Sequence, residues 1–195
     1  MWFEMSQNGA TASADLQGSV DTLKIGILSD THGYLDYRVE AVISHCDAVI
    51  HAGDVCGDHV LEDLAALCPR VFAVAGNNDA ATRWRPNGDQ MSPLPDDFQL
   101  ALPGGKLVVE HGHRFGGNPD HQDLRDAWPD ARLVIYGHTH RQIVDQNIAP
   151  WVINPGAAGR TRTGKGPSCI VLTVNSHGEW MLEPLCFEGA VRRVA

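Results

Sequence analysis

Short apolar runs that end at polar turn residues recur along most of the chain. β-branched and other apolar residues fill each run, and Gly, Asp, Asn or His follows, which is the pattern of buried β-strands. Six such runs are LKIGILSD (23–30), AVIHAGD (48–54), VFAVAGNND (71–79), KLVVEHGH (106–113), LVIYGHTH (133–140) and WVINPG (151–156). Two more, SCIVLTV and EWMLEPLCF, lie near the carboxyl end and indicate a meander.

Stretches with helical spacing separate the first three runs, at residues 36–46 and 57–68. The second stretch carries one apolar stripe, formed by Val60, Leu61, Leu64, Ala65 and Leu67. The chain therefore begins as βαβαβ. Because the strands are nearly continuously apolar, we expect both of their faces to be buried, and we predict an α/β fold with a mostly parallel sheet covered by helices.

Residues 1–22 differ from the rest of the chain because they are small and polar and show no apolar periodicity. We predict a disordered extension there and one domain over residues 23–195. The content of 43% hydrophobic and 20% charged residues is ordinary for a globular protein. No run of about 18 apolar residues and no secretory signal is present, so we expect a cytoplasmic protein without a membrane partner. The five cysteines include no CxxC pair, which indicates reduced thiols.

The formal net charge of −9 limits the partners of the chain. This charge repels a nucleic-acid backbone, and no cluster of Lys and Arg residues offsets it locally, so we expect no stable nucleic-acid binding. A small phosphorylated substrate is still compatible with this charge, because a metal site overrides the global field locally. The sequence leaves open whether the chain forms a homo-oligomer.

A basic segment, GRTRTGKGP (159–167), nearly matches a phosphate-binding P-loop. Gly166 stands where Ser or Thr would bind magnesium, and Pro167 leads into a strand instead of a helix, so we reject a nucleotide P-loop. Its three cations either contact a substrate phosphate or lie in a solvated turn. They are Arg160, Arg162 and Lys165.

Polar residues that can bind metals gather just past the ends of the predicted strands. They are Asp30, His32, Asp54, Asn77, His111, His113, His138 and His140. The first two intervals, from Asp30 to Asp54 and from Asp54 to Asn77, each have the length of about one βαβ unit. Because the carboxyl ends of parallel strands converge on one edge of a sheet, we expect these side chains to face each other.

Carboxylates, an amide and imidazoles are oxygen and nitrogen ligands for divalent transition metals, and the lack of nearby thiolates argues against a structural zinc site. These groups exceed the needs of one ion. Two ions roughly 3.5–4 Å apart would use them all, and such pairs clamp the attacking and leaving oxygens of an in-line displacement at phosphorus. Asp54, at the centre of the set, is the natural bridge between two ions.

Five motifs in order, SDTHG, HAGD, GNND, EHGH and GHTH, resemble the signatures of the calcineurin-like metallophosphoesterases. Together with INPG (153–156), they are most similar to the small bacterial and archaeal phosphodiesterase branch, and the resemblance covers about residues 23–187. It implies an αββα sandwich and a metal-dependent phosphoric diester hydrolase. The implied ions are often Mn²⁺, with Zn²⁺, Fe²⁺ or Ni²⁺ as alternatives.

Carried over by motif, the resemblance implies one metal held by Asp30, His32 and His140. The other metal is held by Asn77, His111 and His138, and Asp54 bridges the two. The implied reaction is in-line attack by a metal-bridging hydroxide on a small phosphodiester. Counting two divalent ions, two carboxylates and this hydroxide leaves a charge of about +1, which suits a diester better than a monoester that carries roughly −1.5 to −2.

One position departs from the family pattern. Many members have a histidine after the metal-binding asparagine that protonates the leaving group, but Asn78 stands there and cannot donate a proton as a general acid. His113 is the nearest substitute, and water on the metal is the alternative, so the catalytic candidates among the residues are Asn77 and His113. Asp79 could orient a metal-bound histidine. We interpret His51 as a hydrogen-bonded strand residue and not as a ligand.

Two alternative functions remain. The first keeps the site and changes the substrate to a phosphomonoester. The second is a non-catalytic scaffold, because the small subunit of retromer resembles this fold, although its ligand set is degraded at the GD aspartate and the GN asparagine. Asp54 and Asn77 are both present here, which favours the enzyme.

Overall fold

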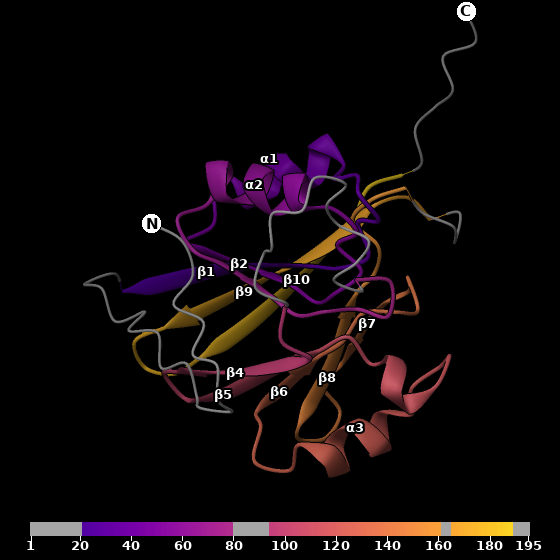
Figure 1. Cartoon of the computed structure of the whole chain (residues 1–195). Coiled ribbons are helices and arrows are strands. Elements are labelled where there is room, and N and C mark those ends of the chain that lie inside the picture. Colours follow the sequence, from indigo (N-terminus) through magenta and orange to yellow (C-terminus); the bar gives the residue numbers. More distant parts are fainter. Residues whose placement is uncertain (1–20, 80–93, 161–164, 189–195) are drawn as a thin grey trace, which may run out of the picture.

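Two five-stranded sheets face each other at the centre of the computed structural model, and helices lie on their outer sides (Figure 1). The structure describes residues 21–79, 94–160 and 165–188. This αββα arrangement confirms the predicted fold class. Of the predicted extension, only Thr22 lies in a described element, as the first residue of a strand.

The first sheet has the strand order β10-β9-β1-β2-β3. Its strands are β1 (Thr22–Leu28), β2 (Ala48–His51), β3 (Val71–Ala73), β9 (Ser168–Asn175) and β10 (Trp180–Cys186). β1, β2 and β3 are parallel, whereas β9 and β10 run antiparallel to their neighbours. The predicted βαβαβ start and the predicted carboxyl-terminal meander are therefore both confirmed, and they belong to one sheet.

The second sheet has the order β4-β5-β6-β8-β7. Its strands are β4 (Asp97–Leu102), β5 (Gly105–Glu110), β6 (Leu133–Ile135), β7 (Gln142–Asp145) and β8 (Trp151–Pro155). The three central strands are parallel, and β4 and β7 pair antiparallel at the two edges. The sequence pattern did not reveal β4 and β7, because edge strands bury less of each side chain. All four residues of β7 are only half-buried.

Helices α1 (Tyr37–Ile43) and α2 (Asp58–Leu67) lie over the first sheet, and α3 (His121–Ala127) lies over the second (Figure 1). A short 3₁₀ helix, η1 (His113–Phe115), precedes α3. The sequence predicted α1 and α2 but did not reveal α3, whose buried residues are Leu124 and Arg125. No helix within the described ranges is long and apolar enough to cross a membrane.

Alternate residues of the inner strands face different cores, which explains their continuous apolar sequence. In β1 and β2, Ile25, Ile27 and Ile50 pack between the two sheets, while Leu28 and Val49 pack beneath α1 and α2. All five are fully buried. Each such strand is thus fixed on both faces, and the polar residues at its carboxyl end are held in place by this packing.

Candidate metal centre

Five of the seven predicted metal ligands have left-handed backbone conformations. Within the described residues, six residues other than glycine have a positive φ angle: Asp30, His32, Asp54, Cys56, His138 and His140. Such a conformation costs an ordinary residue on the order of 1 kcal/mol and persists where the surroundings enforce it. Five of these six residues are predicted metal ligands. Local strain is therefore concentrated at the centre that the sequence singled out.

Main-chain hydrogen bonds tie the loops after β1 and β2 together. Asp30 donates its N–H to the carbonyl oxygen of Gly53 at 3.0 Å, and His32 donates to that of Asp54 at the same distance. These bonds hold the two predicted carboxylate ligands side by side. They also explain how the strained conformations are maintained.

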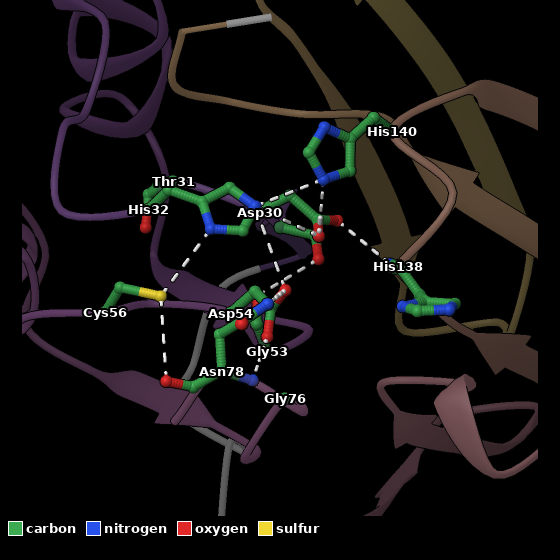
Figure 2. Close-up of polar contacts among 12 residues, drawn as sticks. Asp30, Thr31, His32, Gly53, Asp54, Cys56, Gly76, Asn78, His138 and His140 are labelled. Atoms are coloured by element: carbon green, nitrogen blue, oxygen red, sulfur yellow. Dashed lines mark hydrogen bonds and ion pairs between the residues drawn. The ribbon is translucent and has the colours of Figure 1, made fainter. Parts of the chain in front are cut away.

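The first predicted ligand group is assembled in the structure. Nε2 of His140 lies 3.1 Å from Nε2 of His32 and 3.3 Å from Oδ1 of Asp30 (Figure 2). The ligand atoms of all three residues fall within 4.8 Å of one another. Asp30 and His32 follow β1 of the first sheet, and His140 lies between β6 and β7 of the second sheet. This group therefore joins the two halves of the sandwich.

A second group consists of Asp54 and His111, again together with Asp30. Oδ1 of Asp54 lies 3.5 Å from Nε2 of His111, whereas Oδ2 of Asp54 lies 3.8 Å from Nε2 of His32. The two oxygens of one carboxylate thus face ligands of two different groups. This is the placement that a bridging ligand requires.

The other predicted ligands of the second ion differ in their placement. The ring of His138 packs edge-on against His111, with 5.3 Å between ring centroids, and the main-chain N–H of His138 donates to Oδ2 of Asp30 at 3.0 Å. Asn77 is exposed, and its neighbour Asn78 contacts the carboxylate instead. Asn78 donates its main-chain N–H to Oδ1 of Asp54 at 2.8 Å and its side-chain amide to Oδ2 at 2.7 Å (Figure 2).

Among the residues that the structure describes, two buried atoms of predicted ligands have no hydrogen-bond partner, Oδ1 of Asp30 and Nε2 of His111. A buried polar atom without a partner costs about 1–3 kcal/mol, and a cation would supply the missing interaction to both. The opposite nitrogen of the His111 ring, Nδ1, bonds the carbonyl oxygen of Ala52 at 2.8 Å. That bond fixes the ring and leaves Nε2 as the ligand atom. The residues present therefore fit divalent cations.

Electrostatics keep the carboxylate of Asp54 ionised. Burial alone would raise the pKa of Asp54, but His111 and the two donors of Asn78 outweigh it and hold this pKa well below its ordinary value. Burial opposes protonation of His111, yet Asp54 and Asp30 raise the pKa of this imidazole above its ordinary value. Burial and the nearby His111 lower the pKa of His138. A carboxylate that is already charged at neutral pH is prepared to bind a cation.

His113 lies at the rim of the centre, on η1. Its side chain is exposed, and its ring centroid lies 5.6 Å from that of His111 and 6.4 Å from that of His138. The buried carboxylate of Glu110 accepts hydrogen bonds from Arg114 at 2.6 Å and from the indole of Trp128 at 2.6 Å. These bonds anchor both ends of the turn that carries His113.

Two residues support the centre through contacts that the sequence did not indicate. Buried Asn154, from the INPG motif, donates its amide to the carbonyl oxygen of Gly137 at 2.6 Å and to Oγ1 of Thr139 at 3.1 Å. It thereby ties the GHTH turn to β8. That Asp79 could orient a metal-bound histidine stays a prediction. Its carboxylate accepts three main-chain N–H groups, those of Val55, Cys56 and Gly76.

Glycines in the motifs permit close approach. A Cβ on Gly76 would collide with the main-chain nitrogen and Oδ1 of Asp54, and one on Gly137 would collide with Oγ of Ser29.

His51 is buried, and its Nε2 lies 2.9 Å from Oγ1 of Thr31, which confirms its interpretation as a hydrogen-bonded strand residue.

The cations of the basic segment are only partly described. Arg160 and Lys165 are exposed, and Arg162 lies outside the described residues.

Comparisons with known proteins agree with this geometry. A model of the calcineurin-like phosphoesterase superfamily domain matches residues 23–177. A phosphodiesterase of Methanocaldococcus jannaschii is 29% identical over 153 residues, which are 73% of this chain and 88% of that protein.

Two solved structures show the same fold. Vacuolar protein sorting 29 from Cryptosporidium parvum is 18% identical, with a TM-score of 0.71 over 87% of this chain and 100% of the other. A novel archaeal phosphodiesterase is 24% identical, with a TM-score of 0.60 over 84% and 100% of the two chains.

Proposed function

The chain belongs to the calcineurin-like phosphoesterase superfamily, a family of hydrolases, and from this premise we propose that it hydrolyses small phosphodiesters with two divalent metal ions. One observation carries the proposal more than any other. The two oxygens of Asp54 face His32 on one side and His111 on the other, 3.8 and 3.5 Å away. A carboxylate shared in this way is the distinguishing requirement of a two-ion site.

The metal ligands that we propose follow the predicted sets. Asp30, His32 and His140 would hold one ion, and His111, His138 and Asn77 the other, with Asp54 between them. We expect Mn²⁺, with Zn²⁺, Fe²⁺ or Ni²⁺ as alternatives, because the donors are carboxylate oxygens, an amide oxygen and imidazole nitrogens. When bound, such ions would activate a water molecule and offset the negative charge of the phosphate.

The residues of the chain itself divide the remaining work. Asp54 and Asp30 supply the negative charge that positions the cations, and Ala52 keeps the His111 ring oriented through its carbonyl oxygen. His113, exposed beside His111 and His138, would give a proton to the departing alcohol. Asn78 takes no part in proton transfer, because its amide is engaged with Asp54.

The substrate that we propose is small and carries a single negative charge at phosphorus. The net charge of −9 opposes long polyanions, so a short diester suits the chain better than a nucleic-acid strand. We expect the protein to act in the cytoplasm. A phosphomonoester is the alternative substrate for the same site.

A scaffold function is the second candidate, because the fold also matches vacuolar protein sorting 29. Against it stands the assembled ligand set. Within the described part of the chain, Asp30 Oδ1 and His111 Nε2 are buried without a hydrogen-bond partner, which is costly in a protein that has no use for a cation.

Turnover of a chromogenic phosphodiester by metal-stripped protein, titrated with Mn²⁺, tests the proposal. We expect metal-dependent diester turnover that exceeds that of the matching monoester and is lost in Asp54→Asn. Asp130→Asn is the matched control, because it removes the same charge from an exposed position. No turnover with any of the four ions would favour the scaffold.

A further inference from the structure

Two exposed tyrosines flank the start of α1, and each has an arginine over its ring. The guanidinium carbon of Arg160 lies 5.3 Å from the ring centroid of Tyr34, and that of Arg38 lies 5.5 Å from the ring centroid of Tyr37. The tyrosines are 42% and 69% exposed. Both pairs have the geometry of a cation–π contact, yet their surroundings differ.

The charge of Arg38 is already used within the protein. Its Nε donates to Oδ1 of Asp36 at 2.8 Å, its Nη2 to Oδ2 of the same carboxylate at 3.0 Å, and its Nη1 to the carbonyl oxygen of Glu188 at 2.7 Å. Arg160 forms no ion pair with any described acidic residue, and it is exposed. Among the described residues, no carboxylate competes with an anion for the charge of Arg160, whereas Asp36 already binds Arg38.

The Tyr34–Arg160 pair is attached to the loop that carries the first metal ligands. Tyr34 follows His32 by two residues, and its N–H donates to the carbonyl oxygen of Thr31 at 3.0 Å. The segment before Arg160 is bound to the same loop, because Ala158 donates to the carbonyl oxygen of Ser29 at 2.8 Å.

Gly159 makes the approach of the two segments possible, since a Cβ there would collide with the carbonyl oxygens of Thr31 and Tyr34. The main chain that carries the pair is thus fixed relative to Asp30 and His32 by contacts on both sides.

We propose that Tyr34 and Arg160 form a substrate subsite that binds the aromatic group of an aryl or nucleoside phosphodiester. The inference rests on the proposed phosphodiesterase function and names its substrate class. A flat aromatic group can stack on the exposed tyrosine ring and on the planar guanidinium. Such stacking accepts any flat aromatic ring, because it requires only a π-face. The same guanidinium attracts the phosphate, and an alkyl diester of equal charge gains only this second contribution.

Binding of two phosphonates tests the subsite without requiring turnover. Phenylphosphonate and methylphosphonate carry the same anionic group and differ in the aromatic ring. Calorimetry on the full chain with Mn²⁺ present gives a Kd for each. We expect the wild-type protein to bind phenylphosphonate about tenfold more tightly, because stacking of one aromatic ring contributes on that order.

The variants separate the two contributions. Tyr34→Ala should bring the ratio of the two Kd values close to one, and Tyr34→Phe should retain it. Arg160→Ala should weaken the binding of both phosphonates. Tyr37→Ala is the control, because it removes another exposed, Arg-paired tyrosine that lies outside the proposed subsite, and the ratio should not change.

Equal Kd values in the wild-type protein, or an unchanged ratio in Tyr34→Ala, would overturn the subsite. Neither result would contradict the proposed hydrolysis, which the diester turnover assay tests separately. Absence of turnover together with an intact, Tyr34-dependent ratio would in turn contradict the proposed hydrolysis and leave the subsite standing as a binding site.

Discussion

The side-chain amide of Asn154 donates a hydrogen bond of 2.6 Å to the main-chain carbonyl oxygen of Gly137. This bond joins the end of β8 to the turn that presents His138 and His140, and Asn154 is fully buried. The INPG motif therefore has a structural role in the metal centre although it contributes no ligand.

Replacing Asn154 with Ala should loosen that turn. The change leaves the carbonyl oxygen of Gly137 without this donor and should lower the free energy of unfolding by about 1–3 kcal/mol. It should also weaken Mn²⁺ binding about tenfold or more, as loss of a supporting partner typically does. Thermal unfolding and Mn²⁺ titration measure the two effects. Asn147→Ala, at an exposed position, should leave the Mn²⁺ affinity unchanged, and equal affinities for Asn154→Ala and wild type would contradict this role.

His113 should matter in proportion to how poor the leaving group is. If it protonates the departing alcohol, His113→Ala should reduce kcat on an alkyl leaving group by about 100-fold or more, and it should change kcat on p-nitrophenolate much less, because that anion leaves without a proton. A series of diesters with leaving groups of rising pKa gives the slope. A slope unchanged by His113→Ala, as we expect for exposed His45→Ala, would exclude His113 as the donor.

Much of the fold follows from the sequence because the inner strands are buried on both faces. Runs such as that of β1, in which Ile27 faces one core and Leu28 the other, are unmistakably apolar. The edge strand β7 gives no such signal, since each of its residues is only half-buried. The apolar pattern of a strand reflects how much of it is buried, and edge strands bury too little to be predicted from that pattern.

For the candidate metal centre, the sequence indicates the predicted ligands but not the contacts that support them. Asp30, His32, Asp54, His111 and His140 stand in recognisable motifs, and the structure brings all five together. Their supporting contacts depend on residues that are distant in sequence, as with Asp79, which holds the loop after β2 through Val55 and Cys56. The sequence also gave no sign that Asn78, rather than Asn77, would contact Asp54. The role of Asn77 as a ligand stays a prediction.

Stability should fall in acid through Asp145. Hydrogen bonds from Arg125 at 2.6 Å and from His121 at 2.8 Å outweigh partial burial and lower the pKa of Asp145 below its ordinary value. Because the folded pKa lies below the unfolded one, the stabilisation is complete above about pH 4 and is lost as the pH falls toward the folded pKa.

Asp145→Asn removes this contribution. We expect it to lower the free energy of unfolding by about 1–3 kcal/mol at pH 7. The difference from wild type should shrink steadily below about pH 4, where the wild-type carboxyl begins to lose its advantage. Urea unfolding at pH 7, 5, 4 and 3 measures it. A difference that stays constant over this range would show that the carboxylate charge is not the source.

Gly76→Ala should damage the metal centre by steric means alone. The added methyl group would collide with the main-chain nitrogen and Oδ1 of Asp54, and the main chain of one of the two loops must move to make room. Overpacking of this kind costs about 1–3 kcal/mol of stability, and the movement displaces the carboxylate that faces both ligand groups. Gly117→Ala is the matched control, because a Cβ at Gly117 meets no atom within 4 Å. We therefore expect Mn²⁺ affinity and diester turnover to fall in Gly76→Ala and to remain at the wild-type level in Gly117→Ala. If both variants retained wild-type Mn²⁺ affinity, the close packing of Gly76 on Asp54 would not be what positions the bridging carboxylate.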